Sequence, residues 1–425
     1  MSLSKVRKAE EKYLLHTYDR HPILLTHGKG AYVYADDGSR YLDFLSGIGV
    51  MALGYSHPAI TRVIREQAGK MVHCSNLFYS EYPSLLAQKL VKLSGLERAF
   101  FCNSGTEAWE GALKIARAVA SGKGLKKRTR FLALENSFHG RTMGAVATTY
   151  TEKYRKPFAP LMPGVSFVKF DDVEDLKRKF DQDVCAVCIE PIQGEGGVHP
   201  VSREFMQTAR ELTQASGALL LLDEIQCGLG RTGKMFAYQH YGVKPDVVTL
   251  AKPLAAGLPL GAVLVTADVA GAIHPGMHGT TFGGGPLACA VALEVLKVIE
   301  EKKILAHVKE VGGYFLHLLQ QLDARHGCIV DVRGAGLMLG VELDSADLAK
   351  AAMKAMMEQK IIINRTHETV LRFLPPFVVT KKQVEVVVKA LDQILSSCAS
   401  SGDAAPVTKR SPRQRLPKAV ASGAQ

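Results

Sequence analysis

Residues 219–263 read LLLLDEIQCGLGRTGKMFAYQHYGVKPDVVTLAKPLAAGLPLGAV. Two short apolar runs, 218–222 and 247–251, end directly in charged residues, Asp223 and Lys252. Apolar runs of this length between turn residues are typical of central strands in a parallel sheet. Ligands bind such sheets beyond the carboxyl ends of the strands, so we expect Asp223 and Lys252 to face one crevice.

Two interpretations of this pair remain open from the residues alone. Most charged side chains are simply exposed, so the pair could be a salt bridge or two solvated groups outside the core. Alternatively, the lysine forms a Schiff base and the aspartate pairs with a ring nitrogen, as pyridoxal phosphate requires. Such a lysine is a good nucleophile at neutral pH only where its surroundings lower its pKa. The second interpretation predicts a phosphate site elsewhere in the chain.

Length and composition favour a large globular protein. A chain of 425 residues suggests two domains, or one α/β domain with an appendage. The 47% hydrophobic and 22% charged residues are typical of soluble proteins. No apolar run is long enough to cross a membrane, so no membrane partner is expected. The first 20 residues lack the apolar core of a signal peptide, so we expect a cytoplasmic location.

The net charge of +12 is partly local. The segment from residue 399 onward contributes +4 through five basic residues against Asp403: Lys409, Arg410, Arg413, Arg415 and Lys418. The remaining charge forms no basic stripe interleaved with aromatic residues, so nucleic acid is not an expected partner. We expect a disordered basic tail and a pocket for anionic ligands.

Of eight cysteines, only Cys185 and Cys188 form a CxxC pair, and no second pair accompanies them. We therefore expect reduced thiols and no metal site.

Strand-like and helical segments alternate over most of the chain. The strand-like runs are 99–102, 131–134, 166–170, 184–189, 218–222, 247–251 and 262–265, with helical stretches at 106–120, 173–180 and 202–216. This alternation predicts an α/β fold with a mostly parallel, doubly wound sheet. From residue 286 a smaller α+β domain is expected. The predicted divisions are an N-terminal arm with small-domain strands (1–58), a large domain (59–285), a C-terminal small domain (286–395) and the tail (396–425).

The predicted phosphate site has a candidate in FFCNSGTEAWEGALKIAR, residues 100–117. Ser104 and Glu107 have the spacing of a capping box between a strand and a helix. A glycine at such a turn exposes backbone N–H groups, and a helix N-terminus favours an anion. Capping boxes are common, so a simple cap and an anion site both remain open.

Gly228, Gly230 and Gly233 spell GxGxxG, the pattern of a dinucleotide site. The preceding strand ends too early and no good helix start follows, so we do not expect a dinucleotide. The segments SFHGRT (137–142), EPIQGEGG (190–197) and RFLPP (372–376) also follow strand-like runs. They offer an aromatic ring, two acids and two arginines, each of which could equally be a core or surface residue.

In combination, these motifs resemble the class III (ornithine/acetylornithine-type) aminotransferases, which are pyridoxal-phosphate enzymes of fold type I. The resemblance covers residues 32–394 and rests on motifs in the family's order: FCNSGTEA, SFHGRT, EPIQGEGG, LLLDEIQCGLGRTG, TLAKPL, GLPLGAV, HGTTFGGG, RGAGLMLGVEL and LRFLPPF. It implies a large domain with a mostly parallel seven-stranded sheet and a smaller α+β C-terminal domain.

The resemblance also implies residue roles. Lys252 would form the Schiff base with the cofactor and then act as general acid and base. The other cofactor-binding residues would be Gly105, Thr106, Phe138, Asp223 and Gln226, together with Thr281 from the partner subunit of a homodimer. Arg141 would bind the substrate α-carboxylate. Glu195 would pair with Arg372 and release it when a second carboxylate arrives.

Within the family, NLFYSEYPSLLAQKLV (76–91) and Ile48 resemble the acetylornithine group. The implied reaction moves the δ-amine of N-acetylornithine to 2-oxoglutarate, giving N-acetylglutamate semialdehyde and glutamate in arginine biosynthesis. GABA, ornithine, succinylornithine or another ω-amine remain alternative donors, and a catalytically silent dimeric scaffold is the non-enzymatic alternative.

Three positions depart from the family pattern. Pro253 follows Lys252 where the family usually has glycine, and could reorient the lysine. Trp109 replaces a small polar residue, and Gly285 stands where the family has asparagine. None of these changes removes a chemical group.

Overall fold

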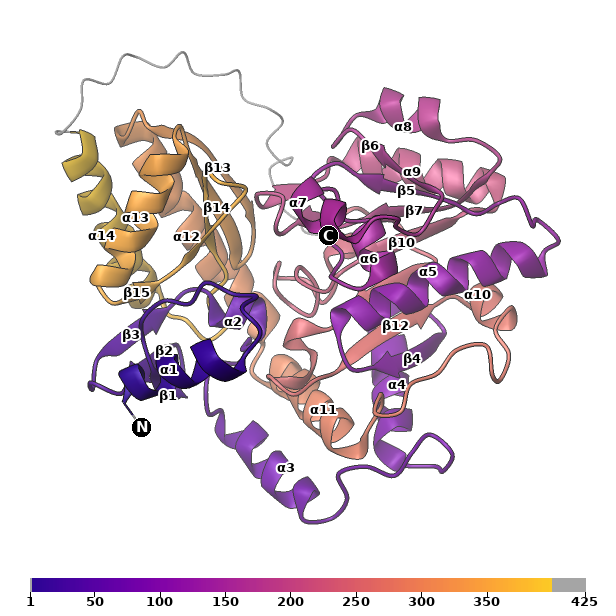
Figure 1. The fold of residues 1–425 in the computed structure, drawn as a ribbon, viewed down its shortest axis with the longest axis horizontal. Coiled ribbons are helices and arrows are strands. Elements are labelled where there is room, and N and C mark those ends of the chain that lie inside the picture. The colour runs from indigo at the N-terminus through magenta and orange to yellow at the C-terminus, as the bar shows by residue number, and fades with distance from the viewer. Residues whose placement is uncertain (1, 400–425) are drawn as a thin grey trace, which may run out of the picture.

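A computed structural model describes residues 2–399 of the chain (Figure 1). The predicted disordered tail, 396–425, begins too early. Residues 396–399 continue the last helix, α14 (Lys381–Ala399), where the hydroxyls of Ser396 and Ser397 donate to the carbonyls of Asp392 and Ile394. The rest of the predicted tail lies outside the described residues.

The centre of the larger part is a seven-stranded sheet, which confirms the predicted fold class. Its spatial order is β4 (Arg98–Cys102), β12 (Gly261–Val265), β11 (Val247–Leu250), β10 (Leu219–Asp223), β7 (Val184–Ile189), β5 (Arg130–Leu134) and β6 (Val165–Val168). Only β12 runs antiparallel to its neighbours. The central strands β7, β10, β11 and β12 are buried along their whole length, which explains their continuous apolar sequences.

Helices cover both faces of this sheet (Figure 1). On one face lie α5 (Gly105–Gly122) and α10 (Ala267–Gly271). On the other face lie α4 (Glu81–Ser94), α8 (Val173–Lys179) and α9 (Arg203–Ser216). Shorter helices in the connections are α2 (Ser46–Gly49), α6 (Met143–Ala147), α7 (Glu152–Arg155), η1 (Lys156–Phe158), η2 (Ala237–His240) and η3 (Lys252–Ala255).

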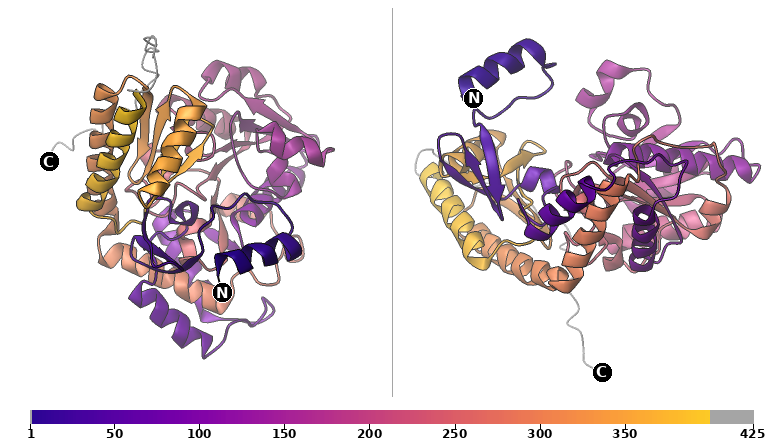
Figure 2. Two further views of the ribbon diagram at one scale, coloured as in Figure 1. Left: turned by 60° about the vertical axis from the view of Figure 1, so that its left-hand side comes forward. Right: turned by 90° about the horizontal axis from the view of Figure 1, so that it is seen from below.

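A second, smaller part lies beside the large sheet (Figure 2). Its sheet has the order β13 (Ile329–Ala335), β14 (Met338–Leu343), β17 (Val370–Phe373) and β16 (Asn364–Thr366). The helices α12 (Ile304–Arg325) and α13 (Ala346–Glu358) pack with α14 around it. The N-terminal strands β1 (Leu25–Lys29), β2 (Tyr32–Ala35) and β3 (Arg40–Asp43) join this part because β3 pairs with β15 (Ile361–Ile362).

Helix α11 (Pro286–Glu301), predicted to open the C-terminal domain, packs on α3 (Pro58–Ala68) and α4 and also meets α12. Because α11 contacts helices on both sides of the predicted boundary, the domain boundary at residue 286 stays a prediction. Helix α1 (Leu3–Tyr13) has no buried residue and stands off the body of the molecule (Figure 2). Within residues 2–399, no helix combines the length and the apolar character needed to cross a membrane.

Candidate active site

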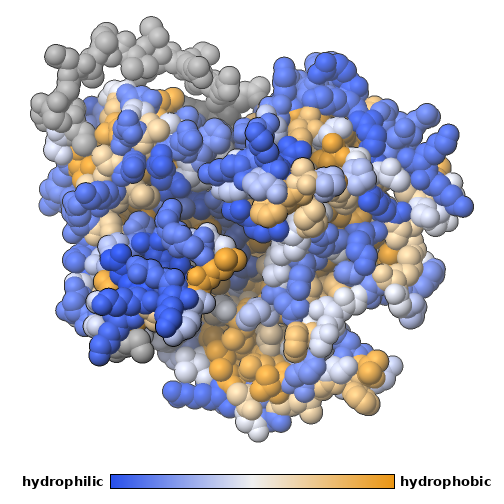
Figure 3. All heavy atoms as spheres, viewed as in Figure 1, coloured by the Kyte–Doolittle hydropathy of each residue, from blue (hydrophilic) through white to orange (hydrophobic). Residues whose placement is uncertain are grey.

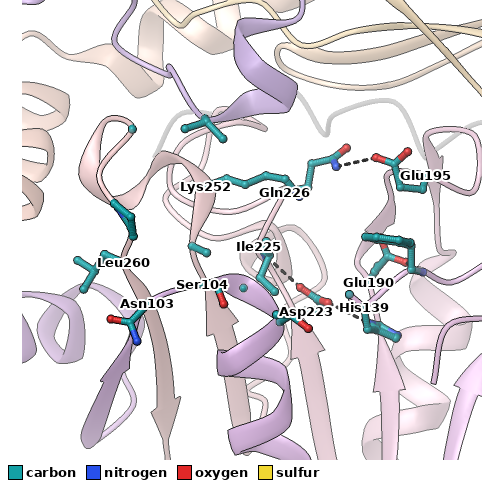
Figure 4. Close-up of a pocket in the computed structure, with 18 of the residues that line it drawn as sticks. Asn103, Ser104, His139, Glu190, Glu195, Asp223, Ile225, Gln226, Lys252 and Leu260 are labelled. Carbon is teal, nitrogen blue, oxygen red and sulfur yellow. Dashed lines mark hydrogen bonds and ion pairs between the residues drawn. The ribbon is translucent and has the colours of Figure 1, made fainter. Parts of the chain in front are cut away.

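Strands β10 and β11 are parallel neighbours, with Asp223 opposite Thr249 in register. Asp223 is the last residue of β10, and Lys252 follows β11 as the first residue of η3. Both residues line one cavity of about 320 Å³ beyond the carboxyl ends of these strands (Figure 4). The predicted crevice is therefore present.

Lys252 reaches into the cavity without a hydrogen bond to any residue in the described range 2–399 (Figure 4). Removal from water lowers the pKa of its ammonium group, although the nearby carboxylates of Glu195 and Asp223 oppose this effect. A lowered pKa increases the fraction of neutral amine at physiological pH. The surroundings of Lys252 therefore suit a nucleophile and a proton carrier.

Asp223 is held from three directions. Its Oδ1 accepts hydrogen bonds from the backbone N–H of Ile225 (3.1 Å) and the hydroxyl of Thr249 (3.3 Å). Its Oδ2 lies 2.7 Å from Nδ1 of the buried His139. A carboxylate only accepts, so this contact places a proton on Nδ1 of the imidazole. The aspartate is thus fixed at the cavity wall.

The N-terminus of α5 opens on the same cavity through Ser104, Gly105 and Thr106. Ser104 Oγ accepts from the backbone N–H of Glu107, as a helix cap should. The Glu107 carboxylate reaches the N–H of Asn103 instead of the N–H of Ser104, so the predicted capping box closes one residue earlier. A side chain at Gly105 would lie 2.8 Å from Ile225, so only glycine fits there.

The loop that carries SFHGRT is tied to this helix. Thr106 Oγ1 contacts the Thr142 hydroxyl at 2.9 Å and accepts the N–H of Arg141. Gly140 has φ of +134°, and a Cβ there would lie 2.3 Å from Thr106 Oγ1, so the close approach requires glycine. Phe138 lines the cavity, whereas the exposed Arg141 guanidinium lies 3.7 Å from the ring centre of Tyr154.

Glu195 and the fully buried Arg372 form an ion pair of 2.5 Å at the cavity. Gln226 joins the pair, because its Oε1 accepts from the Arg372 guanidinium and its Nε2 donates to Glu195. Asn364, the cross-strand neighbour of Arg372, accepts from Nε at 3.1 Å. The remaining nitrogen, Nη2, is buried and has no hydrogen-bond partner among residues 2–399. Arg372 is thus oriented, and the two N–H groups of Nη2 are left for a ligand.

Burial alone would raise the pKa of Glu195, but Arg372, Lys252 and Gln226 together hold it below its ordinary value. The acid is therefore charged at neutral pH and neutralises Arg372.

Most of the predicted site residues meet at this cavity. Its walls include Gly105, Thr106, Phe138, Glu195, Asp223, Gln226 and Lys252. Arg372 lies directly behind Glu195 and Gln226. Arg141 is not among the lining residues, and Thr281 is exposed on a loop of the same chain.

Two chemically important residues of the site were not predicted from the sequence, His139 and Glu190. Both belong to motifs that the sequence displays, SFHGRT and EPIQGEGG, so their position after strands was the available signal. Glu190 accepts the backbone N–H groups of Phe138 and Gly194, and thereby ties together the two loops that carry Phe138 and Glu195. Burial raises the pKa of Glu190 to about 7.

The three departures leave the cavity intact. Pro253 is an early residue of η3, where a missing N–H costs no helical hydrogen bond, and Lys252 stays on the cavity. Trp109 is fully buried in α5. Gly285 precedes α11 and provides no side-chain cap. Gly228, Gly230 and Gly233 lie in turns, and the next helical segment is the short η2.

The residues present fit pyridoxal phosphate. Its aldehyde needs an amine with a lowered pKa, its ring nitrogen a fixed carboxylate, and its phosphate a helix N-terminus. Lys252, Asp223 and the start of α5 meet these needs around one cavity. Phe138 adds an aromatic face.

Comparisons with known proteins agree with this chemistry. A family model described as Aminotransferase class-III matches residues 13–395. The acetylornithine aminotransferase of Methanocaldococcus jannaschii is 46% identical over 389 residues, which cover 91% of this chain and 97% of that relative. A solved ornithine aminotransferase from Toxoplasma gondii, with partial occupancy of PLP at its active site, has a TM-score of 0.90 at 32% identity, covering 94% of this chain and 95% of its own. The acetylornithine aminotransferase from Elizabethkingia anophelis has a TM-score of 0.82 at 31% identity, covering 93% and 100%.

Proposed function

Because this chain belongs to the class III aminotransferase family, we propose that it transfers the δ-amino group of N-acetylornithine to 2-oxoglutarate. The products are N-acetylglutamate semialdehyde and glutamate, which gives the enzyme a role in arginine biosynthesis. The cofactor is pyridoxal phosphate. The observation that carries the proposal is the pair of adjacent strand ends that brings Asp223 and Lys252 to one cavity with the α5 N-terminus.

Bound pyridoxal phosphate supplies an aldehyde for the amino group and a ring that withdraws electrons from the reacting carbon. Asp223, fixed by His139 and Thr249, would bind the protonated ring nitrogen. Gly105 and Thr106 would bind the phosphate through the N-terminus of α5. Phe138 would stack on the ring, and Gln226 would contact its hydroxyl group. The neutral amine of Lys252 removes the proton from the substrate carbon that bears nitrogen.

Two arginines would each bind a different substrate carboxylate. Arg141, exposed beside Tyr154, would bind the α-carboxylate of N-acetylornithine. This donor has no carboxylate beside the reacting amine, so Glu195 keeps Arg372 neutralised. 2-Oxoglutarate has a second carboxylate, which would displace Glu195 and use the unpaired Nη2 of Arg372. One cavity would thereby accept both substrates in turn.

A homodimer is part of the proposal, with Thr281 reaching the partner's phosphate site. Loops 71–79 and 279–285 lie side by side, because Asn76 donates to the carbonyls of Thr280 and Gly283. They carry exposed apolar side chains, among them Phe78 at 72% and Phe282 at 68% exposure. Apolar surface gathers on the lower part of the face in Figure 3, where α3, α11 and the loop after α3 lie. Such a surface is typical of a protein interface.

The test is the absorption spectrum of the purified protein with bound cofactor while amino donors are added singly. N-acetylornithine should convert the visible band of the lysine-bound cofactor, and succinylornithine, ornithine, GABA and lysine should convert it more slowly. Faster conversion by one of those donors would assign the donor to it instead. Absence of the band after added pyridoxal phosphate would contradict the proposed chemistry.

Lys252→Ala should abolish both the band and turnover, with a rate loss of at least ~10³-fold, because nucleophile and proton carrier are the same residue. Lys234→Ala is the matched control, since Lys234 is exposed and lies outside the cavity. Turnover by Lys252→Ala equal to that of the control would remove Lys252 from the mechanism.

A further inference from the structure

We propose that Trp109, the single tryptophan of the chain, is a positioning residue that holds the imidazole of His139 against Asp223. The inference rests on the proposed function, in which Asp223 pairs with the ring nitrogen of the cofactor. The family resemblance implies a small polar residue at position 109, where this chain has Trp109.

The two rings are stacked. Their centres lie 4.0 Å apart and their planes differ by 8°. Trp109 is fully buried in the first turns of α5, four residues after Gly105, and His139 is buried in the loop that follows β5. Parallel aromatic rings at this distance make a close contact that resists tilting of either ring.

Two consecutive threonines hold this stack in place. Trp109 Nε1–H donates to Thr148 Oγ1 at 2.9 Å, and the Thr148 hydroxyl donates in turn to the carbonyl of Ala145 at 3.0 Å. The backbone N–H of His139 donates to Thr149 Oγ1 at 3.0 Å. The two residues that follow α6 thus fix both the plane of the indole and the backbone of the histidine.

The stack matters because His139 is bonded at only one nitrogen. Nδ1 contacts Asp223 at 2.7 Å, whereas Nε2 is buried and has no hydrogen-bond partner among residues 2–399. A ring held at one nitrogen can still tilt about that contact. The flat face of Trp109 supplies the restraint that a second hydrogen bond would otherwise give. Asp223 depends on this ring because His139 is the partner of its Oδ2.

Trp109→Leu keeps most of the apolar volume but removes the flat face. We expect roughly tenfold weaker binding of pyridoxal phosphate and a similar loss in the rate of the donor half-reaction. Side chains in direct contact typically have coupling energies of this size. Trp109→Phe should recover most of both losses, because a benzene ring can still stack.

A double-mutant cycle with His139→Ala separates positioning from packing. If Trp109 acts through His139, Trp109→Leu should have little further effect on cofactor affinity in the His139→Ala background. Equal losses in both backgrounds would overturn the inference.

The cofactor-free protein gives an independent readout. The NMR signal of the Nδ1–H proton of the His139 imidazole should be present in the wild type and lost in Trp109→Leu. A retained signal would also overturn the inference.

Phe131→Leu is the matched control, because Phe131 is fully buried in the same apolar cluster, whereas the ring stacked on His139 is that of Trp109. It should lower the free energy of unfolding without changing the imidazole signal. If Trp109→Leu does not fold, Thr148→Val leaves the indole in place but removes the hydroxyl that accepts from it and that bonds to the carbonyls of Gly144 and Ala145. This variant should give a smaller loss of cofactor affinity, which disappears in the His139→Ala background. A loss that persists there would count against the inference.

Wild-type protein that binds no cofactor would overturn the proposed function. Additive losses in an active enzyme would overturn only the role of Trp109.

Discussion

At the scale of single residues, the ion pair between Glu195 and Arg372 decides which carboxylates the cavity accepts. Arg372 is completely buried, and a buried charge without a partner is costly. Glu195 is its only acidic hydrogen-bond partner in the described chain, while Gln226 and Asn364 fix its direction without neutralising it. The position of one carboxylate therefore separates two substrate classes.

Glu195→Gln should change which of the two substrate classes the cavity favours. The uncompensated Arg372 would favour an incoming carboxylate, so the KM for 2-oxoglutarate should fall by roughly tenfold, and the donor half-reaction with N-acetylornithine should slow by a similar factor. Single-turnover kinetics of the two half-reactions measure both effects. Glu300→Gln, which removes a surface pair with Lys89, is the control and should change neither. Equal changes in both half-reactions would argue against a gating role.

Asp223 and Lys252 could be predicted because each follows an apolar strand, and strand ends meet at one edge of a parallel sheet. His139 could not be assigned a partner from the sequence. Its contact with Asp223 joins residues 84 positions apart and depends on how the loop after β5 bends over the sheet. Asn364 was missed for a similar reason, because its contact with Arg372 follows from the register of a strand of three residues.

At the scale of elements, the long buried strands were predictable and the exposed ones were not. β7 and β10 are continuous apolar runs because both of their faces are covered. β1 is almost entirely exposed, with the sequence LTHGK, and lacks the alternation that marks a half-buried strand. β1 is a strand because its backbone pairs with that of β2. The side chains of β1 carry no sequence pattern that indicates this pairing.

The connection from β10 to η2 depends on the buried carboxyl group of Glu224. It accepts the backbone N–H groups of Ala237 (2.8 Å) and Tyr238 (2.6 Å). Burial nevertheless raises the pKa of Glu224 to about 8. Between pH ~4.3, the ordinary pKa of a glutamate, and pH about 8, the carboxyl group of Glu224 keeps its proton in the native state but has lost it in the unfolded state. Stability contributed by Glu224 is therefore present at low pH and is lost as the pH rises toward about 8.

Glu224→Gln should weaken this pH dependence, because glutamine does not titrate. From pH ~5 to ~8 the unfolding free energy of the wild type should fall by ~2–4 kcal/mol more than that of the variant. Urea denaturation at a series of pH values measures the difference. Glu211→Gln, at an exposed position on α9, should leave the wild-type profile unchanged. Parallel profiles for wild type and Glu224→Gln would show that Glu224 is ionised throughout.

At the scale of the whole molecule, one described chain leaves part of its predicted site unused. Thr281 is exposed on the loop that also carries Phe282. That loop lies next to the start of α5, since Asn103 donates to the hydroxyl of Thr280. The sequence predicted the residue through a family resemblance, but no pattern within one chain states whether a side chain serves its own cavity or that of a partner.

Mixed dimers can decide where Thr281 acts. Thr281→Ala should weaken binding of pyridoxal phosphate by roughly tenfold or more, because it removes a hydrogen bond to a charged group. Lys252→Ala should be inactive. If Thr281 serves the partner's cavity, a hybrid of these two variants has one cavity with both mutations and one cavity with neither. Co-expressed subunits with different tags, purified as hybrids, should then bind cofactor at one site per dimer with wild-type affinity and show about half of wild-type turnover.

If Thr281 serves its own chain, every cavity in the hybrid has one mutation, and no site of wild-type affinity can form. The affinity of the hybrid therefore distinguishes the two arrangements without any assumption about rate. Failure to isolate any hybrid would contradict the dimer itself, and would leave the exposed apolar loops 71–79 and 279–285 without the partner that their composition favours.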